Sequence, residues 1–408
     1  MSVKNERLLL LVLAAVQFTN IVDFMIMMPM GDILQRALQI SPFQFSLLIS
    51  AYPVAAFAVS LFGVFFLDKF DRKKALLFAY VGFVLGTLSS AVVPNTDHHE
   101  MNYYLFIGTR LLTGLFGGIL GALVMSIVGD VIPLERRGRA MGLVATAFSL
   151  ASVVGVPLGL ELVNRFEGNW HIPFYMVSML GALVIPLIIT QVPSVRGHLD
   201  NRTGPADPFR TLRVAFNSVN QQKALLFMTL LIIGHFSIIP FITPYMINNV
   251  GLTQAQIPWI YFVGGACTVV SSPLVGRLVD RYGRKRMFAI MATFSMLPVL
   301  LITNLPPMAL GFVLVITGSF FIAVTGRMIP ANTLITAVVK PENRGGFMSL
   351  NSSFVSLATG IASVIGGSIV VQPSPGEPLQ NYMWVGLISV TFSVITILLS
   401  RRLQETGA

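Results

Sequence analysis

Two similar stretches of sequence decide the fold: VFFLDKFDRKK from Val64 to Lys74 and GRLVDRYGRKR from Gly276 to Arg286. They lie 212 positions apart, and each follows a long apolar run. A second pair of loops, PLERRG around Arg137-Gly138 and KPENRGG around Arg344-Gly345, is separated by 207 positions. Two independent offsets that agree within about five residues indicate a duplicated unit.

The composition excludes an ordinary water-soluble protein. Of the 408 residues, 54% are hydrophobic and only 11% are charged, and the mean hydropathy is +0.78. Soluble domains carry about 25% charged residues. Disorder, collagen and coiled coil are excluded by the same values, and the single Cys267 excludes a disulfide-knit secreted protein. The chain is therefore predicted to be a polytopic membrane protein.

Twelve apolar stretches are long enough to cross a bilayer, which takes about 20 residues of helix. The predicted spans are 8–30, 44–66, 75–93, 103–128, 140–162, 172–190, 223–247, 258–275, 287–303, 309–336, 346–371 and 381–400. The connections are short, so no soluble domain is expected. The first span is too long for a removable signal peptide and lacks a small-residue cleavage site, so we expect an uncleaved signal anchor.

The distribution of Lys and Arg predicts the orientation in the membrane. With the N-terminus inside, 23 of the 27 basic residues fall on the inner side, and the opposite loops hold only Arg36 and Arg165. Both termini are therefore expected in the cytoplasm, and the protein in the cell inner (plasma) membrane. The net charge of +10 is then a topology signal, and no nucleic-acid partner is expected.

The longest connection, from Gln191 to Gln222, is rich in polar and turn residues and divides the spans six and six. We therefore predict an N-terminal six-helix bundle over 1–190, a cytoplasmic linker over 191–222 and a C-terminal six-helix bundle over 223–408. Two parallel six-span halves around a site at the bilayer midplane are a known transporter architecture.

At these residues the chain resembles the major facilitator superfamily, because GRLVDRYGRKR matches its G-x-x-x-D-R-x-G-R-K/R loop signature at every fixed position. Within it, RLLTG (Arg110 to Gly114) and GVPLG (Gly155 to Gly159) are similar to motifs of bacterial drug:proton antiporters and sugar-efflux-type permeases. Val156 departs from that pattern and places Pro157 one position off. The resemblance implies an all-α membrane fold of twelve transmembrane helices in two six-helix bundles, working by alternating access and favouring efflux.

The resemblance also implies conformational clasps, in which the Asp and Arg of the loop bond to an acid at the cytoplasmic end of the fourth span. The first copy of the loop is degenerate, because Val64 and Asp71 stand at its two glycine positions. The expected clasp residues are Asp68, Arg72 and Asp130 in the first half, and Asp280, Arg284 and Lys285 in the second. The alternative is that the basic loops serve topology and the carboxylates only cap helices.

Charges at membrane depth are rare and costly, so they are candidates for function. Asp23 and Arg110 each lie seven residues from the outer end of their spans, roughly 10 Å deep, and an ion pair between them fits this geometry. A carboxylate in a low-dielectric site holds its proton more tightly, whereas a nearby guanidinium favours the ionised form. The pair therefore suits proton coupling. It could instead be static and hold two spans together, or serve only as a substrate ligand.

The second half has no such pair, because no Asp or Glu lies inside its spans. Arg327, near the midplane, must find backbone carbonyls, water or an anionic ligand. We predict that it contacts an anionic, zwitterionic or polar neutral substrate, the rival being lipophilic cations. His235 is either a further contact for substrate or proton, or a packing residue. Neutral hydrogen bonds to the substrate are expected from Gln17, Asn20, Asn332 and Asn351.

The small-residue motif in the fifth span, Gly155 and Gly159 with Pro157, is interpreted as a close helix contact first and as part of a gate second. The methionines at 25, 27, 28 and 30 are interpreted as adaptable lining or lipid-facing packing rather than a metal site. The sequence contains no P-loop, no HExxH and no Cys/His cluster, so no metal, other cofactor or enzymatic activity is expected.

These observations predict a secondary active transporter that couples protons to efflux of a small organic compound and functions as a monomer in the lipid bilayer. The alternative within transport is a proton symporter or facilitator that imports a polar nutrient. A membrane-embedded enzyme and a non-transporting sensor are the alternatives from other classes.

Overall fold

The computed structural model describes residues 6–63, 70–196, 213, 215–340 and 343–405, and Asp68 lies outside them. The described residues are nearly all helical. Twelve helical stretches among them are long and apolar enough to cross a membrane, which confirms the predicted number of spans. They are Glu6–Ile26, Pro42–Phe62, Arg72–Ala91, His99–Val131, Glu135–Arg165, Ile172–Gln191, Val219–Asn248, Gln254–Tyr282, Arg284–Ile302, Leu310–Ala337, Arg344–Ile369 and Tyr382–Arg402.

The chain forms two compact units. The first unit comprises Met1–Met27 and Ala51–Pro208, and the second comprises Met28–Ser50 and Phe209–Ala408. Residues 28–50 thus belong to the second unit although they lie in the first half of the sequence. The boundaries 1–190, 191–222 and 223–408 stay a prediction.

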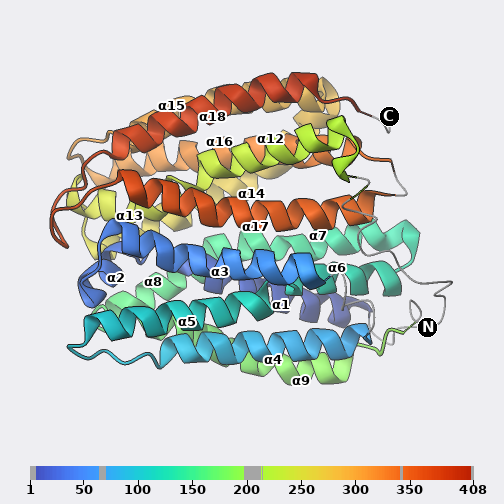
Figure 1. Cartoon of the computed structure of the whole chain (residues 1–408), viewed down its shortest axis with the longest axis horizontal. Helices are drawn as coiled ribbons and strands as arrows, with labels where there is room; N and C mark the ends of the chain where they lie inside the picture. The colour runs from blue at the N-terminus through green and yellow to red at the C-terminus, as the bar shows by residue number, and fades with distance from the viewer. Residues whose placement is uncertain (1–5, 64–69, 197–212, 214, 341–342, 406–408) are drawn as a thin grey trace. The chain divides into compact units, whose positions relative to one another are not determined.

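The first unit is a helical bundle (Figure 1). Its helices are α1 (Glu6–Ile26), α4 (Arg72–Ala91), α5 (His99–Gly117), α6 (Leu120–Val131), α7 (Leu134–Leu150), the π-helix η2 (Ala151–Gly155), α8 (Val156–Arg165) and α9 (Ile172–Gln191). Helix α4 packs against α5 and α9, and α1 packs against α7 and α9. Buried apolar side chains of α1, α4, α6, α7 and α9 fill the interior, among them Leu13, Phe83 and Ile127. Such close packing holds helices together where lipid removes the hydrophobic driving force.

The second unit repeats this pattern of neighbours. Its helices are α2 (Gly31–Leu38), α12 (Val219–Phe236), α13 (Ile239–Asn248), the 3-10 helix η3 (Gln254–Gln256), α14 (Ile257–Tyr282), α15 (Arg284–Ile302), α16 (Leu310–Ala337), α17 (Arg344–Ile369) and α18 (Tyr382–Arg402). Helix α15 packs against α16 and α18, and α12 packs against α17 and α18. The third span thus neighbours the fourth and sixth, as the ninth neighbours the tenth and twelfth. This agreement supports the duplication inferred from the loops. Helix α3 (Pro42–Gly63) has residues in both units.

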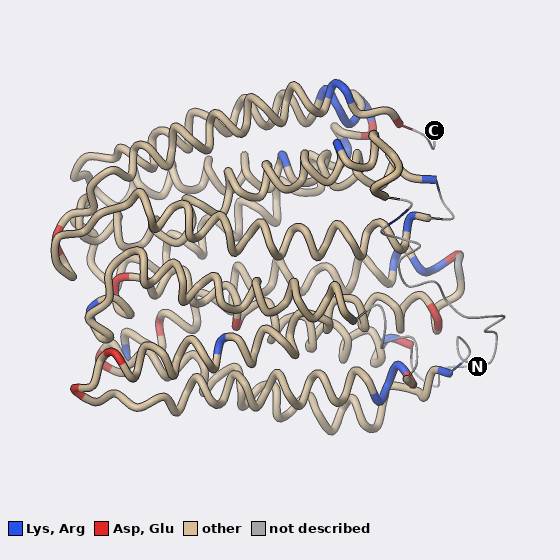
Figure 2. The backbone as a smooth tube through the Cα atoms, viewed as in Figure 1, with Lys and Arg blue, Asp and Glu red and all other residues tan. Residues whose placement is uncertain are grey.

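Charged residues are sparse along the helices and gather near helix ends, as Figure 2 shows. Spans of this composition leave few polar side chains inside the bundles, and a charge buried among them is costly unless it is paired. The buried Asp and Arg residues of the described chain therefore mark where a site can lie.

Candidate functional site

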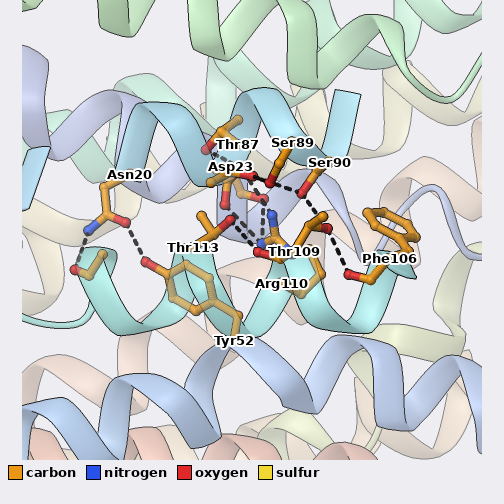
Figure 3. Close-up of polar contacts among 12 residues, drawn as sticks. Asn20, Asp23, Tyr52, Thr87, Ser89, Ser90, Phe106, Thr109, Arg110 and Thr113 are labelled. Atoms are coloured by element: carbon orange, nitrogen blue, oxygen red, sulfur yellow. Dashed lines mark hydrogen bonds and ion pairs between the residues drawn. The ribbon is translucent and has the colours of Figure 1, made fainter. Parts of the chain in front are cut away.

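Asp23 and Arg110 form a buried, bidentate ion pair inside the first unit (Figure 3). Arg110 Nη2 lies 2.9 Å from Asp23 Oδ2, and Nη1 lies 3.1 Å from Oδ1. The hydroxyl of Thr87 on α4 donates a third hydrogen bond to Oδ1, at 3.1 Å. The side chains of Asp23 and Arg110 are 0% and 1% exposed. The structure thus joins the first, third and fourth spans through one carboxylate.

Aromatic rings enclose the guanidinium of Arg110. Its Cζ lies 5.3 Å from the ring centre of Tyr52 and 5.7 Å from that of Phe174. The Tyr52 hydroxyl donates a hydrogen bond to Asn20 Oδ1, and Asn20 Nδ2 donates to the carbonyl of Gly117, at 3.2 Å. Each end of the Asn20 amide therefore makes one hydrogen bond, which leaves one N–H and one lone pair of the amide for a further partner.

The sequence did not single out Tyr52 or Thr87. Thr87 lies near the end of α4 beside Ser89 and Ser90, and such hydroxyls in a helix usually bond to their own backbone. The sequence carried no direct signal for Tyr52, and the link appears only in the structure, where a Cβ added to Gly114 would lie 2.4 Å from the Tyr52 carbonyl oxygen. Gly114 belongs to the RLLTG segment that carries Arg110, so the glycine lets the fourth span approach Tyr52.

The fifth span approaches α1 through its glycines. A Cβ added to Gly155 would lie 2.3 Å from Val22 Cγ2, and one added to Gly159 would lie 2.8 Å from Ile26 Cδ1. The helix is locally a π-helix over Ala151–Gly155, and Pro157 follows in the first turn of α8. A π-bulge inside a helix is frequent at functional sites. The contact lies beside Asp23, one residue after Val22.

Arg327 is buried inside the second unit with hydroxyl partners instead of an acid. Its Nη1 donates to Ser295 Oγ on α15 at 3.1 Å and to Ser393 Oγ on α18 at 3.0 Å. Arg327 is 1% exposed, and its Nε and Nη2 have no hydrogen-bond partner among the described residues. The structure therefore turns Arg327 toward the ninth and twelfth spans, and the backbone carbonyls considered from the sequence are not its partners there.

The other predicted polar residues of the second half make no hydrogen bond with Arg327 among the described residues, although His235 lies close enough to interact with its charge. The His235 ring lies 4.9 Å from the Phe236 ring and 6.3 Å from that of Phe320, and its Nδ1 has no partner among the described residues. Asn351 is 4% exposed with its Oδ1 unpaired in the described chain, whereas Asn332 is exposed. In the first unit, Gln17 is partly buried and faces Gly121 of α6. The hydrogen bonds of the described residues do not join these side chains into one site.

His235 nevertheless occupies the position that matches Asp23 in the repeat. The two residues are 212 positions apart, which is the offset of the loop motifs, and each is followed by Phe. Helix α1 ends at Ile26 and α12 ends at Phe236, so both residues lie in the last turn before a helix break. The duplication therefore placed an acid in one half and an imidazole in the other.

Two of the residues predicted to form the clasp of the first half, Arg72 and Asp130, make an ion pair at helix ends. Arg72 Nε lies 3.4 Å from Asp130 Oδ2, and both side chains are partly exposed. Asp71, which departs from the family loop, caps α4 by accepting from the Lys73 amide at 2.8 Å. It also accepts from the Ser194 hydroxyl and, at 3.1 Å, from Arg196, so it anchors the segment after α9.

These contacts determine the protonation of Asp71, which lies outside the spans. Burial by itself raises the pKa of the carboxyl, but hydrogen bonds from Ser194, the Lys73 amide, Arg196 and the Val195 amide outweigh it, so the pKa lies below its usual value. Asp71 is therefore a permanent anchor at neutral pH.

The second loop binds the C-terminal segment. Arg284 Nη1 lies 3.1 Å from Glu405 Oε2, and Lys285 Nζ donates to the carbonyl of Leu403 at 2.6 Å. Asp280 is exposed, and it makes no hydrogen bond or ion pair with the described residues. Asp280, the acid predicted for the clasp of the second half, therefore has no bonded partner among the described residues.

Asp32 carries a polar cluster that the sequence did not predict. This carboxylate is 3% exposed and accepts from Asn248 Nδ2 at 2.7 Å, Gln254 Nε2 at 2.8 Å and Arg36 Nε at 3.0 Å. Arg36 also donates to Asn248 Oδ1 at 2.9 Å. The cluster ties α2 to the end of α13 and to η3 within the second unit. Its signal was weak, because Asp32 and Arg36 look like an ordinary i,i+4 surface pair.

The duplicated set of twelve apolar helices, with a few buried charges, defines a multi-pass membrane protein. The model of the Major Facilitator Superfamily matches residues 13–238 and 224–406, so the chain belongs to this superfamily. It is therefore a membrane transporter of small molecules and not an enzyme.

Named relatives agree with this assignment. The chain is 24% identical to an uncharacterised MFS-type transporter, YbcL, of Bacillus subtilis over 81% of this chain and 79% of that one. It is 23% identical to a probable sugar efflux transporter of Pasteurella multocida (93% and 88% covered) and 21% identical to multidrug resistance protein 2 of Bacillus subtilis (90% and 90%). Among solved structures, the D-xylose-proton symporter has a TM-score of 0.76 at 16% identity, with 95% of this chain and 96% of that chain covered. This likeness shows the fold alone.

Proposed function

We propose that this transporter exports a small organic compound from the cytoplasm in exchange for protons, and that the Asp23–Arg110 pair carries the proton. The single observation behind the proposal is the ion pair itself, a carboxylate and a guanidinium 2.9 Å apart and withdrawn from solvent. We further propose that the protein lies in the inner membrane with both termini in the cytoplasm and works as a monomer. Relatives named for sugar efflux and multidrug resistance support export.

The geometry supports a two-state coupling mechanism. In the closed pair, Arg110 and Thr87 occupy both carboxylate oxygens of Asp23. Protonation in place would leave the guanidinium as an unpaired buried charge, which is strongly unfavourable. A proton therefore enters only when the pair separates or becomes hydrated, and it leaves when the pair closes again. Movement of the first span against the fourth thus couples proton transfer to alternating access.

In this proposal, the conformational change involves the clasps and the contact between the fifth span and α1. The Arg72–Asp130 pair at 3.4 Å forms in one state and breaks in the other, and Asp68 is proposed to join it. Gly155 and Gly159 let α1 slide beside the fifth span, with Pro157 and the π-helix as the bend. Asp280, Arg284 and Lys285 are proposed to act in the same way in the second half.

Everted membrane vesicles with an imposed pH gradient test both coupling and direction. Wild-type vesicles should accumulate substrate when the lumen is acidic, whereas Asp23→Asn vesicles should bind substrate without accumulating it. The matched control is Glu161→Gln, which removes an acid from an exposed ion pair with Arg165. Full pH-driven accumulation by Asp23→Asn would overturn the proton-carrier role. Uptake into right-side-out vesicles driven by an inward proton gradient would favour the symporter instead.

A further inference from the structure

The guanidinium of Arg327 presents a free side-on edge inside the second unit. Both protons of Nη1 are used, because Nη1 donates to Ser295 Oγ and Ser393 Oγ at 3.1 and 3.0 Å. The opposite edge, formed by Nε and Nη2, has no acceptor among the described residues. This edge is the fork with which arginine binds a carboxylate or another small anion with two parallel hydrogen bonds.

The two serines hold Arg327 in place and cannot neutralise it. The Ser295 hydroxyl donates to the Ala292 carbonyl at 2.7 Å, and the Ser393 hydroxyl donates to the Ser389 carbonyl at 2.9 Å. Each serine oxygen is therefore fixed as an acceptor for Nη1. The helices α15, α16 and α18 thus hold the guanidinium through Nη1 and leave its Nε–Nη2 edge without an acceptor among the described residues.

No acid balances this charge. The acidic residues after the linker are Asp280, Glu342, Glu377 and Glu405, and none lies in the interior of a span. In the first unit, Arg110 is matched by Asp23. A buried guanidinium without a counter-ion is costly in a low-dielectric interior, and the cost falls when an anion binds.

We infer that the Nε–Nη2 edge of Arg327 is a binding site for one small monovalent anion, either a halide or the carboxylate of an organic molecule. The inference specifies the chemical class that Arg327 binds. Only the identification of this anion with the transported substrate rests on the proposed function. Anion binding is measured without transport, so its failure is distinguishable from a failure of proton coupling at Asp23.

Thermal unfolding of the purified full-length protein in detergent tests the site. Sodium chloride or sodium acetate is added stepwise to a low-salt buffer, and the same additions to Arg327→Gln report the effect of ionic strength alone. The wild type should show a saturable rise in Tm of roughly 3 °C or more in at least one series. Arg327→Gln should abolish the rise. The matched control Arg401→Gln, at an exposed position on α18, should keep it.

The two salt series distinguish the sources of the anion. A rise in chloride alone identifies an inorganic ion, and a rise in acetate identifies the carboxyl group of an organic ligand. Arg327→Lys serves if Arg327→Gln does not fold, because lysine keeps the charge and lacks the fork. It should require about tenfold more acetate for half of the rise. A wild type without a saturable rise in either salt, or an unchanged rise in Arg327→Gln, would overturn the inference.

Discussion

Two buried arginines, Arg110 and Arg327, have different partners, and the difference sets their chemistry. Arg110 shares its charge with Asp23, so that the site is neutral as long as the pair is closed. Arg327 has only the hydroxyls of Ser295 and Ser393 and therefore stays cationic. At the scale of the residue, the pair in the first unit is neutral while it is closed and becomes positively charged when Asp23 takes up a proton, whereas the second unit can attract an anion.

Paired substitutions separate a proton carrier from a static ion pair. Arg110→Ala leaves the Asp23 carboxylate buried and unpaired, and we expect a loss of about 3–5 kcal/mol in the free energy of unfolding. The double variant Asp23→Asn, Arg110→Gln removes both charges and should recover most of that stability. Its thermal unfolding and its pH-driven transport are measured together. Restored transport in the double variant would show that the pair only holds the helices.

The anchor at Asp71 predicts a pH dependence of stability. Its pKa is depressed in the folded protein, so its contribution is present above the pKa of an unfolded Asp, about 3.9, and is lost as pH falls through the lower folded value. Unfolding of the wild type and of Asp71→Asn is compared from pH 7 to pH 3. The variant should be less stable at pH 7, and the difference should shrink below about pH 4. A difference that stays constant over this range would assign the effect to geometry alone.

At the scale of the element, the contact between α1 and the fifth span depends on the absence of a side chain. The space at Gly155 is too small for a methyl group, since Val22 Cγ2 would be 2.3 Å away. Gly142, on α7 of the same span, has no such neighbour within 4 Å.

These two glycines give a matched pair of substitutions. Gly155→Ala should lower stability by about 1–3 kcal/mol through overpacking, and transport should fall with it. Gly142→Ala should be neutral or stabilising by up to about 1 kcal/mol, because alanine favours the helix. Thermal unfolding and vesicle transport are measured for both. Equal effects of the two changes would show that the contact with α1 is not required for stability or transport.

The elements also show what could be predicted from the sequence. The spans followed from apolar length alone, and the structure moves most of their ends by only a few residues. The Asp23–Arg110 pair followed from depth and from the scarcity of acids. Thr87, Ser295 and Ser393 could not be predicted, because hydroxyls are common in membrane helices and their partners depend on how each helix is rotated. Asp32 was missed because burial of a loop-side carboxylate depends on tertiary contacts with Asn248 and Gln254.

At the scale of the whole molecule, Asp32 connects a segment of the first sequence half to elements of the second. Residues 28–50 belong to the second unit, and Asp32 in this segment is hydrogen-bonded to Asn248 and Gln254 of the same unit. Asp32→Ala leaves the Asn248 and Gln254 amides without this acceptor, and we expect a loss of about 1–3 kcal/mol. Glu161→Ala is the matched control, because it breaks an i,i+4 pair with 44% of the Glu161 side chain exposed. For that control, thermal unfolding should show a loss of less than about 0.5 kcal/mol in the free energy of unfolding. A similar loss in both variants would show that the Asp32 cluster does not stabilise the protein more than an exposed ion pair does.

The net charge of the buried sites predicts which substrates the transporter accepts. With Asp23 neutralising Arg110, Arg327 is the uncompensated charge, and His235 adds no negative charge in any protonation state. A cation near Arg327 meets Coulomb repulsion that is strong in a low-dielectric interior. We therefore expect transport of anionic, zwitterionic or polar neutral compounds.

A matched panel of anionic, neutral and cationic dyes, measured in vesicles with wild type and Arg327→Gln, checks this expectation. Arg327→Gln should reduce anion transport about tenfold, as loss of a charged hydrogen-bond pair implies, while neutral dyes change less. Transport of cations alone, unaltered by Arg327→Gln, would contradict the prediction, since it would mean that substrates never sense this charge.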